Sequence, residues 1–182
     1  MTGSVERWYE TVLVLRCQAG DEAAFGELVG RYGPRLRYYL RKLLGEIDSV
    51  EDVLQDVWLD VFQSAARLAE PAAFSTWIYR IARDRAYRQL RRRRPRPMED
   101  VEPAFNPRVE EEFSQEDAER IHASLDQLAP EHREVLVLRF LEEMSYDQIA
   151  HVTDCRLGTV KSRIYYAKGA LRRILERSKD HD

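Results

Sequence analysis

Basic, hydroxyl-bearing and aromatic side chains gather in residues 145–171, SYDQIAHVTDCRLGTVKSRIYYAKGAL. The segment predicts two short helices joined by a tight turn, with a capping box of Ser145 and Gln148 opening the first helix. In such a helix-turn-helix the second helix lies in the major groove, where polar groups contact bases and basic groups contact phosphates. The residues expected to face outward from that helix are Gly158, Thr159, Lys161, Ser162, Tyr165 and Tyr166.

The opposite side of the same helix is apolar. The expected inward stripe is Leu157, Val160, Ile164, Ala167, Leu171 and Ile174. The pattern also fits an amphipathic helix that packs on a bundle and keeps a solvated basic face, because a single motif is only a hypothesis. A supporting helix predicted at 130–141 completes a three-helix unit, and this favours the DNA-binding interpretation.

A second basic segment, 74–94 (FSTWIYRIARDRAYRQLRRRR), lies in the other half of the chain. Its expected inner side is Ile78, Ile81, Ala82 and Ala86. Its other side carries Trp77, Arg80, Asp84, Tyr87, Arg88 and Arg91. Basic groups interleaved with aromatic rings suit melted DNA, because charge contacts the backbone and rings stack on unpaired bases. Two alternatives stay open: Trp77 as a core residue, and Arg91–Arg94 as a solubilising tail.

Charge is unevenly distributed along the chain, although the formal net charge is only −3. Residues 1–94 carry 16 basic and 13 acidic side chains, residues 95–130 carry 3 and 10, and residues 131–182 carry 10 and 9. A polyanion responds to local patches rather than to the net charge. Two basic regions separated by an acidic connector therefore predict DNA contacts at two places.

Groups for catalysis or metal binding are not apparent in the sequence. Cys17 and Cys155 fit no metal-ligand spacing, and the acidic run Glu110–Glu112 shows no partner. A DNA-processing enzyme would need a nucleophile or a carboxylate cluster for metal, so we expect no catalytic residue, metal or cofactor. Two thiols, no apolar run long enough to span a bilayer and no signal-peptide pattern predict a protein of the reducing cytoplasm.

Apolar residues recur at helical spacing and strand patterns are nearly absent, so we predict an all-α fold of two small helical domains. The first helix is expected to bury Val5, Trp8, Val12 and Leu15. Asp21 is expected to cap a second helix that Gly33-Pro34 interrupts. Ser49 with Asp52 resembles a capping box for a third helix. That helix is expected to bury Val53, Leu54, Val57, Trp58, Val61 and Phe62.

A proline-rich acidic stretch, 95–107, has no apolar period and predicts an extended linker. We place a first domain at 1–94, the linker at 95–113 and a second domain at 114–182. The second domain is expected to bury Ile121, Leu125 and Leu128. No further domain is expected after its last helix.

The third predicted helix, 49–65, has a polar side opposite its apolar one. That side carries Asp52, Gln55, Asp56, Leu59 and Gln63. Such residues most often form a solvated acidic face. An apolar Leu59 among polar groups also suits a surface that binds another protein.

Two strings in the second half, LAPEHREVLVLRFLEEMSYDQIA and GTVKSRIYYAKGAL, closely resemble region 4 of the bacterial sigma-70 family in its extracytoplasmic-function (ECF) branch. The resemblance implies that this helix-turn-helix recognises the promoter minus-35 element. The residues that inherit contacts to bases and phosphates are Thr159, Lys161, Ser162, Arg163 and Tyr165.

Four residues depart from the family's usual pattern in this region. Asp154, Cys155 and Arg156 replace the glycine, aliphatic residue and proline of the turn. Asp154 tolerates a left-handed backbone better than most residues do. Cys155 is expected to fill the core, and Arg156 either contacts phosphate or remains a solvated charge. Tyr166 stands where a basic residue is common, so base preference there is expected to differ.

The first half is similar to region 2 of the same family. VEDVLQDVWLDVF resembles the part that binds the clamp helices of RNA polymerase, a role that Asp52, Gln55, Asp56 and Leu59 inherit by position. FSTWIYRIARDRAYRQLRRRR resembles the part that recognises and opens the minus-10 element. The resemblance implies contacts from Trp77, Arg80, Asp84, Tyr87, Arg88 and Arg91, with Asp84 where the family usually has Asn.

The loop at 66–73, ARLAEPAA, corresponds to the family segment that captures a flipped base of the non-template strand. Extruding a base costs a few kcal/mol, which a pocket must offset. Because the loop itself offers no stacking side chain, Phe74 or Trp77 is expected to help form that pocket.

The resemblance implies a sigma factor: a dissociable subunit, not itself an enzyme, that binds core RNA polymerase through the clamp helices and flap. Its other expected partners are promoter DNA, both duplex and melted, and an anti-sigma factor. The acidic linker is expected to mimic nucleic acid, with Glu99, Asp100 and Glu102 as candidates. The alternative is a free-standing helix-turn-helix regulator that binds DNA as a dimer, which would leave the helix at 80–94 unexplained.

Overall fold

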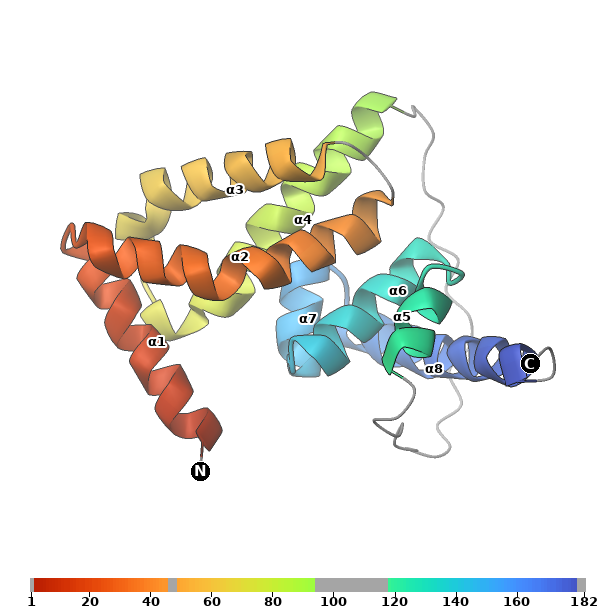
Figure 1. The fold of residues 1–182 in the computed structure, drawn as a ribbon. Coiled ribbons are helices and arrows are strands. Elements are labelled where there is room, and N and C mark those ends of the chain that lie inside the picture. The colour runs from red at the N-terminus through yellow and green to blue at the C-terminus, as the bar shows by residue number, and fades with distance from the viewer. Residues whose placement is uncertain (1, 46–48, 94–117, 180–182) are drawn as a thin grey trace. The chain divides into compact units, whose positions relative to one another are not determined.

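The computed structural model describes residues 2–45, 49–93 and 118–179, and these residues form helices and turns without strands (Figure 1). The chain divides into two compact units, Met1–Arg96 and Pro97–Asp182. The predicted all-α fold is therefore confirmed. The acidic linker at 95–113, with Glu99, Asp100 and Glu102, lies outside the described residues.

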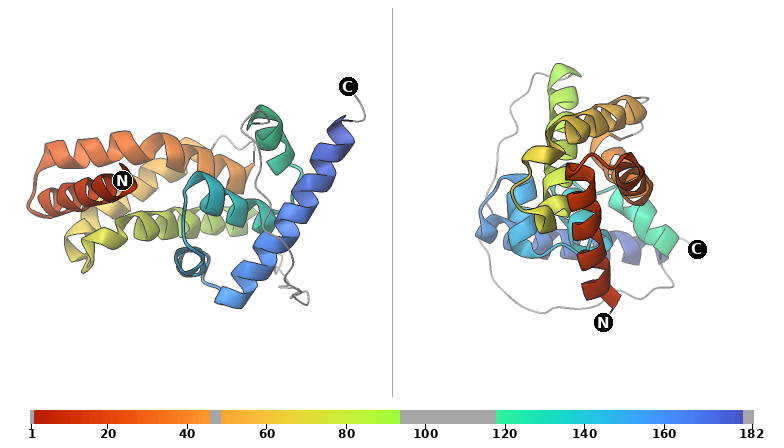
Figure 2. Two further views of the ribbon diagram at one scale, coloured as in Figure 1. Left: turned by 90° about the horizontal axis from the view of Figure 1, so that it is seen from below. Right: turned by 90° about the vertical axis from the view of Figure 1, so that its left-hand side faces the viewer.

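The N-terminal unit is built around α2. Its elements are α1 (Thr2–Gln18), α2 (Glu22–Leu44), α3 (Val50–Ser64), the 3-10 turns η1 (Ala65–Arg67) and η2 (Pro71–Ala73), and α4 (Phe74–Arg93). Helix α2 packs against α1, α3 and α4, and α3 also packs against α4 (Figures 1 and 2). The two short turns lie against α1.

Buried aromatic rings join the helices of this unit. Tyr32 of α2 meets Phe74 of α4 edge to face at 5.4 Å, and Tyr39 meets Tyr79 at 5.2 Å. Such pairs contribute about 0.5–1.5 kcal/mol each beyond the burial of their area. The Tyr32 hydroxyl donates to the Glu10 carboxylate of α1 at 2.6 Å. Burial, followed by the effect of this carboxylate, raises the pKa of Tyr32 far above its ordinary value.

The face that α1 buries differs from the predicted one. Leu13 and Val14 are buried, whereas Trp8 is 70% exposed and Leu15 is 50% exposed, with Val5 also exposed. Three residues of the apolar stripe read from helical spacing therefore lie on the solvent side, and the fourth, Val12, is half-buried. Helix α1 turns its other side to α2 because that side also carries Glu10, the acceptor for Tyr32.

Two predicted features of helix starts and interruptions are wrong. Helix α2 is continuous through Pro34, because buried residues on both sides of the proline hold the two halves on one core. This packing outweighs the cost of an interior proline, about 3 kcal/mol. At the start of α3, Ser49 makes no capping bond; its side chain is buried, and its hydroxyl has no hydrogen-bond partner among the described residues. Asp21 does cap α2, accepting from the Ala24 N–H at 3.1 Å.

The C-terminal unit consists of α5 (Ala118–Leu125), α6 (Pro130–Leu136) with a π-helical turn (Val137–Leu141), α7 (Tyr146–Thr153) and α8 (Leu157–Lys179). Helix α8 packs against α5, α6 and α7. Of the residues predicted for the α5 core, Leu125 and Leu128 are buried, while Ile121 is half-buried.

The turn between α7 and α8 forms through local contacts. The predicted capping box is confirmed: the Ser145 hydroxyl accepts from the Gln148 N–H at 3.2 Å, and the Gln148 side chain accepts from the Ser145 N–H at 2.8 Å. Asp154 follows α7 in the left-handed conformation with φ 53°. Cys155 is half-buried, and its sulfur lies 3.0 Å from the Thr153 hydroxyl.

Candidate nucleic-acid interface

The first turns of α8 form the outward surface of the helix-turn-helix. Arg156, Lys161 and Tyr165 are exposed, and Gly158 between them leaves the backbone open. Thr159 and Tyr166 are half-buried. A helix surface with a small residue among basic and hydroxyl-bearing side chains suits close approach to a DNA groove.

Ser162 does not belong to this surface, which corrects the prediction that it faces outward. The residue is only 7% exposed, and its hydroxyl donates to the Thr159 carbonyl at 3.0 Å. Serine hydroxyls commonly bond back to their own helix in this way. The prediction that Leu157 faces inward is also wrong. Leu157 is exposed, and the inward stripe begins at Val160.

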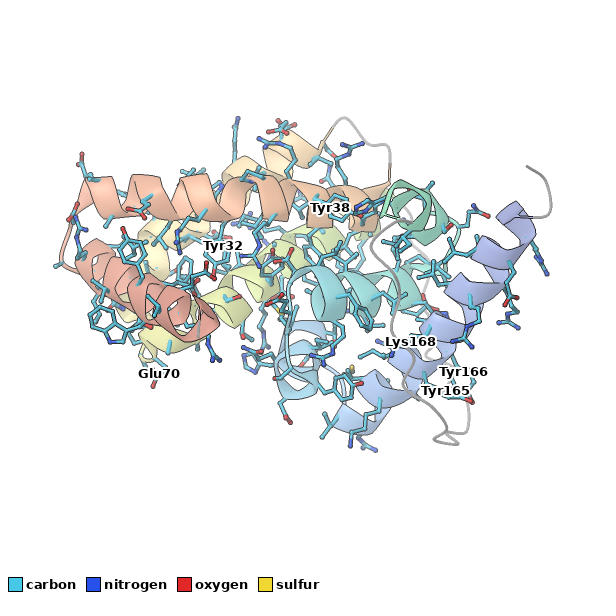
Figure 3. The ribbon with its side chains drawn as sticks, turned by 60° about the horizontal axis from the view of Figure 1, so that its bottom comes forward. Tyr32, Tyr38, Glu70, Tyr165, Tyr166 and Lys168 are labelled. Carbon is cyan, nitrogen blue, oxygen red and sulfur yellow. The ribbon has the colours of Figure 1, made fainter. Side chains whose placement is uncertain are left out.

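Contacts of four side chains fix the shape of the α8 surface. The Tyr165 and Tyr166 rings meet edge to face at 5.3 Å, and Figure 3 shows both on α8 together with Lys168. The Lys168 ammonium lies over the Phe140 ring at 5.3 Å, so it stabilises the π-helical turn. Arg163 extends toward the turn, where its guanidinium lies 4.0 Å from the Cys155 sulfur. Arg163 is therefore half-buried rather than fully extended into solvent.

On α4, the predicted outward residues do share one side. Asp84, Arg88 and Arg91 are exposed, whereas Trp77, Arg80 and Tyr87 are half-buried. The inner side contains Ile78, Ala82 and Ala86 as expected, but also the fully buried Tyr79, and Ile81 is only half-buried. The structure thus brings together the six residues predicted to contact melted DNA.

The aromatic groups near the start of α4 have distinct positions. Phe74 is fully buried against Tyr32, so of the two residues expected to help form a base pocket, Trp77 alone is partly exposed. Trp77 is half-buried and lies tilted against Phe74 at 5.8 Å. Further along α4, the Arg83 guanidinium stacks over the Tyr87 ring at 4.3 Å. Arg83 was not predicted, although its spacing of four residues from Tyr87 could have indicated this contact.

Arg85 connects α4 to α3. Its Nε donates to one carboxylate oxygen of Asp60 at 2.6 Å, and its Nη2 donates to the other. Its Nη1 donates to a carboxylate oxygen of Asp56 at 3.3 Å. The hydrogen bonding that the Arg85 guanidinium donates to the Asp60 carboxylate raises the pKa of Arg85. The basic charge of α4 is therefore divided: Arg85 holds α3, while Arg88 and Arg91 face solvent.

On α3, the four residues predicted to bind a protein partner lie on one exposed side. Asp52, Gln55 and Asp56 are exposed, and Leu59 is 56% exposed. Phe62, predicted to be buried, is 66% exposed while its ring meets Phe25 at 5.4 Å. Its spacing of three residues from Leu59 places it on the same side, a signal that the sequence already contained.

The described residues were also compared with the requirements of a metal site and of a membrane-spanning helix. Their histidine, cysteine and carboxylate side chains do not come together in any group of three that could hold a metal ion. In the same part of the chain, no helix combines the length and apolar composition needed to span a membrane.

Comparison with known proteins decides the family. Residues 28–96 match the model of Sigma-70 region 2, and residues 118–171 match that of Sigma-70 region 4. The RNA polymerase sigma-H factor of Pseudomonas aeruginosa is 32% identical over 179 residues, covering 90% of this chain and 92% of the relative. The ECF RNA polymerase sigma-E factor of Haemophilus influenzae is 35% identical, covering 90% and 93%.

The chain belongs to the ECF family of RNA polymerase sigma factors. The resemblance inferred from the sequence is thereby confirmed, and this ECF sigma factor directs promoter-specific transcription initiation. The family is not one of enzymes, and a free-standing regulator is not favoured.

Two solved structures share the fold of this ECF sigma factor. One is CnrH in complex with the cytosolic domain of CnrY, with a TM-score of 0.68 and 24% identity, covering 92% of this chain and 97% of the other. The second is the sigma factor RpoE in complex with the anti-sigma factor NepR from Bartonella quintana. It has a TM-score of 0.64 and 24% identity, covering 84% and 96%.

Proposed function

We propose that three exposed surfaces of this sigma factor divide the work of promoter recognition. The start of α8 reads the duplex minus-35 element, the outer side of α4 holds the melted minus-10 strand, and the outer side of α3 binds core polymerase. The observation that carries this proposal is that each residue set lies on one side of its own helix and includes exposed side chains. None of these surfaces contributes a reacting group, so the chemistry belongs to the polymerase.

For the duplex element, Lys161 and Tyr165 are the principal groups proposed, because both are exposed on the first turns of α8. Arg156 precedes the helix and suits a phosphate contact. Thr159, Arg163 and Tyr166 are half-buried and complete the surface at its edge. Ser162 supports the helix through its bond to Thr159 and makes no direct contact in this proposal.

For the melted strand, Arg88 and Arg91 provide exposed charge, and Trp77 and Tyr87 provide ring surface. Arg80 lies between these groups. Asp84 faces the same side with negative charge, so we assign it a role in spacing its neighbours rather than in binding phosphate. Positive charge for the backbone with rings for the bases is the combination that single-stranded DNA requires.

For core polymerase, Asp52, Gln55, Asp56 and Leu59 form a polar surface around an apolar centre, and Phe62 enlarges that centre. Exposed aromatic and aliphatic groups ringed by polar ones are typical of binding hot spots. The clamp helices are the proposed contact for this surface, and the flap for the C-terminal unit. Because polymerase and template meet in the bacterial cytoplasm, the proposal places the protein there.

An anti-sigma factor is a further proposed partner. The two solved structures described above are both complexes in which another protein is bound. The exposed apolar residues of α3, Leu59 and Phe62, are suited to such a partner, and its binding there would exclude polymerase.

The direct test is run-off transcription with bacterial core polymerase and genomic promoter fragments. We expect the purified protein to form a stable complex with core and to start transcripts at defined sites. Phe62→Asp should weaken core binding about tenfold, a loss typical of one hot-spot residue. Ala23→Asp, which introduces the same charge at an exposed position in the first turn of α2, is the control. Specific binding of DNA by a protein dimer without core would overturn the proposal.

A further inference from the structure

Gln18 lies at the C-terminal end of α1 and contacts a loop about fifty residues away in the sequence. Its side-chain amide donates to the Ala65 carbonyl at 3.0 Å and to the Leu68 carbonyl at 2.9 Å. Residue 18 is half-buried. One NH2 group has two hydrogens, so this pair of bonds uses its full donor capacity. Gln18 lies before the residues matched by the region 2 model, which begin at 28.

The loop that Gln18 contacts runs from η1 to η2, between the polymerase-facing α3 and the strand-facing α4. Its own backbone bonds are short-range: the Leu68 N–H donates to the Ala65 carbonyl at 3.1 Å, and the Ala73 N–H donates to the Glu70 carbonyl at 2.9 Å. Figure 2 shows the loop beside α1, and Figure 3 shows Glu70 at that end of the N-terminal unit. Gln18 therefore supplies a link from the loop to a helix distant in sequence.

The side chains of this loop are poorly suited to holding a base, so the position of its backbone determines how well a base can bind. Its exposed residues are Ala66, Arg67, Ala69, Glu70 and Ala72, none of which is aromatic. Phe74, directly after η2, is fully buried and unavailable for stacking. Apart from the ring of the half-buried Trp77, a base received here must therefore be held by backbone groups and by the shape of the loop. Such groups bind well only if they are held in place before the base arrives.

We infer that Gln18 is a positioning residue that holds the loop at 65–73 in the shape that receives an unpaired base. The inference rests on the proposed function, in which the N-terminal unit binds the melted minus-10 strand, and on the base-capturing role that the family resemblance implies for residues 66–73. Gln18 touches no DNA in this arrangement and acts through the two carbonyls it fixes. Loss of its amide leaves the loop in place on average but less well ordered, so the captured base is held less tightly.

The test compares Gln18→Met with Gln127→Met in the full chain bound to core polymerase. Methionine keeps the length of the side chain but removes both donors, and Gln127 is exposed in the other unit. The probe is the non-template strand across the minus-10 segment of a promoter mapped by run-off transcription. A set of such strands carries one abasic site at each position in turn.

For the wild type, we expect one abasic position to weaken binding far more than the others, which identifies the captured base. Gln18→Met should weaken binding of the intact strand about tenfold, the loss expected for two neutral hydrogen bonds. On the strand lacking the captured base, Gln18→Met and wild type should bind equally. Gln127→Met should match the wild type on every strand.

Two results would overturn the inference. Equal weakening on intact and abasic strands would show a general structural role for Gln18, and no weakening on either would show no role. If instead the wild type has no sensitive abasic position, base capture by the N-terminal unit is itself wrong. Core binding and upstream duplex binding serve as the folding check and should stay within about twofold, because α3 and α8 are unchanged.

Discussion

Helices α8 and α4 are both long and basic, yet they are positioned in different ways. The start of α8 is fixed by the capping box of Ser145 and Gln148 and by the left-handed Asp154, all within thirteen residues of Leu157. Helix α4 is held by α2 and α3, through contacts such as Arg85 with Asp60, which are 25 positions apart. We therefore expect single changes on the surface of α8 to leave the stability of its unit nearly unchanged. Changes to the residues of α4 that contact α2 or α3 should also disturb the packing of those helices.

The largest expected effect is on stability, and it should differ between two neighbouring aromatic residues of α4. Phe74→Ala should lower the free energy of unfolding by about 3–5 kcal/mol, because it leaves a cavity among buried rings. Trp77→Ala, which truncates a half-buried ring, should cost less stability but weaken binding of the single-stranded minus-10 segment. Urea unfolding and strand binding measure the two effects. Selective loss of strand binding in a stable Phe74→Ala protein would restore Phe74 as a pocket wall.

The next effect tests the link between α4 and α3. A double-mutant cycle with Arg85→Ala and Asp60→Ala should give a coupling free energy of about 1–2 kcal/mol, reduced from that of a buried pair because both side chains are partly exposed. Unfolding in urea provides the four values. Arg88→Ala, on the exposed side of α4, should change stability by less than about 0.5 kcal/mol. A coupling near zero would mean that α4 is positioned by its buried rings alone.

On α8, adjacent residues should behave differently. Lys161→Ala should weaken holoenzyme binding to the upstream duplex about tenfold. It should also reduce the steepness of the plot of log affinity against log salt concentration by about one, as expected for one lost phosphate contact. Ser162→Ala should change this affinity less than about twofold, because its hydroxyl already bonds to Thr159. The measurement is a binding series over several salt concentrations. A larger loss for Ser162→Ala than for Lys161→Ala would reverse our assignment.

This contrast also explains which features could be predicted from the sequence. The capping box at Ser145 and the exposed sides of α3 and α4 follow from short-range spacing and are found in the structure. The buried side of α1 does not follow, because its apolar residues lie on both sides of the helix and the choice is made by Glu10 and Tyr32. Spacing alone cannot identify such a distant partner.

The same limit applies to the candidate surfaces. Ser162 occupies an outward position by helical spacing, but its short side chain bonds to its own helix. Nothing in the local sequence around Arg85 or Gln18 distinguishes these two residues from other polar residues. Only the fold shows that their side chains join segments distant in the sequence. The family resemblance predicted the surfaces, and the side-chain geometry shows which of their residues are exposed.

The smallest predicted effect concerns the turn before α8. There the local backbone geometry alone should decide whether a substitution raises or lowers the free energy of unfolding. Asp154 has φ 53°, a conformation that costs residues with a Cβ about 1–2 kcal/mol and glycine little. Asp154→Gly should therefore raise the free energy of unfolding by about 0.5 kcal/mol, after allowance for the greater freedom of glycine in the unfolded chain. The matched change Asp147→Gly, in the first turn of α7, should lower it by about 0.5–1 kcal/mol, because glycine disfavours helix and the helix start loses an acidic group. Opposite signs in urea unfolding would show that the backbone at Asp154 sets the turn. A loss of stability in both variants would instead show that the Asp154 side chain itself holds the two helices together.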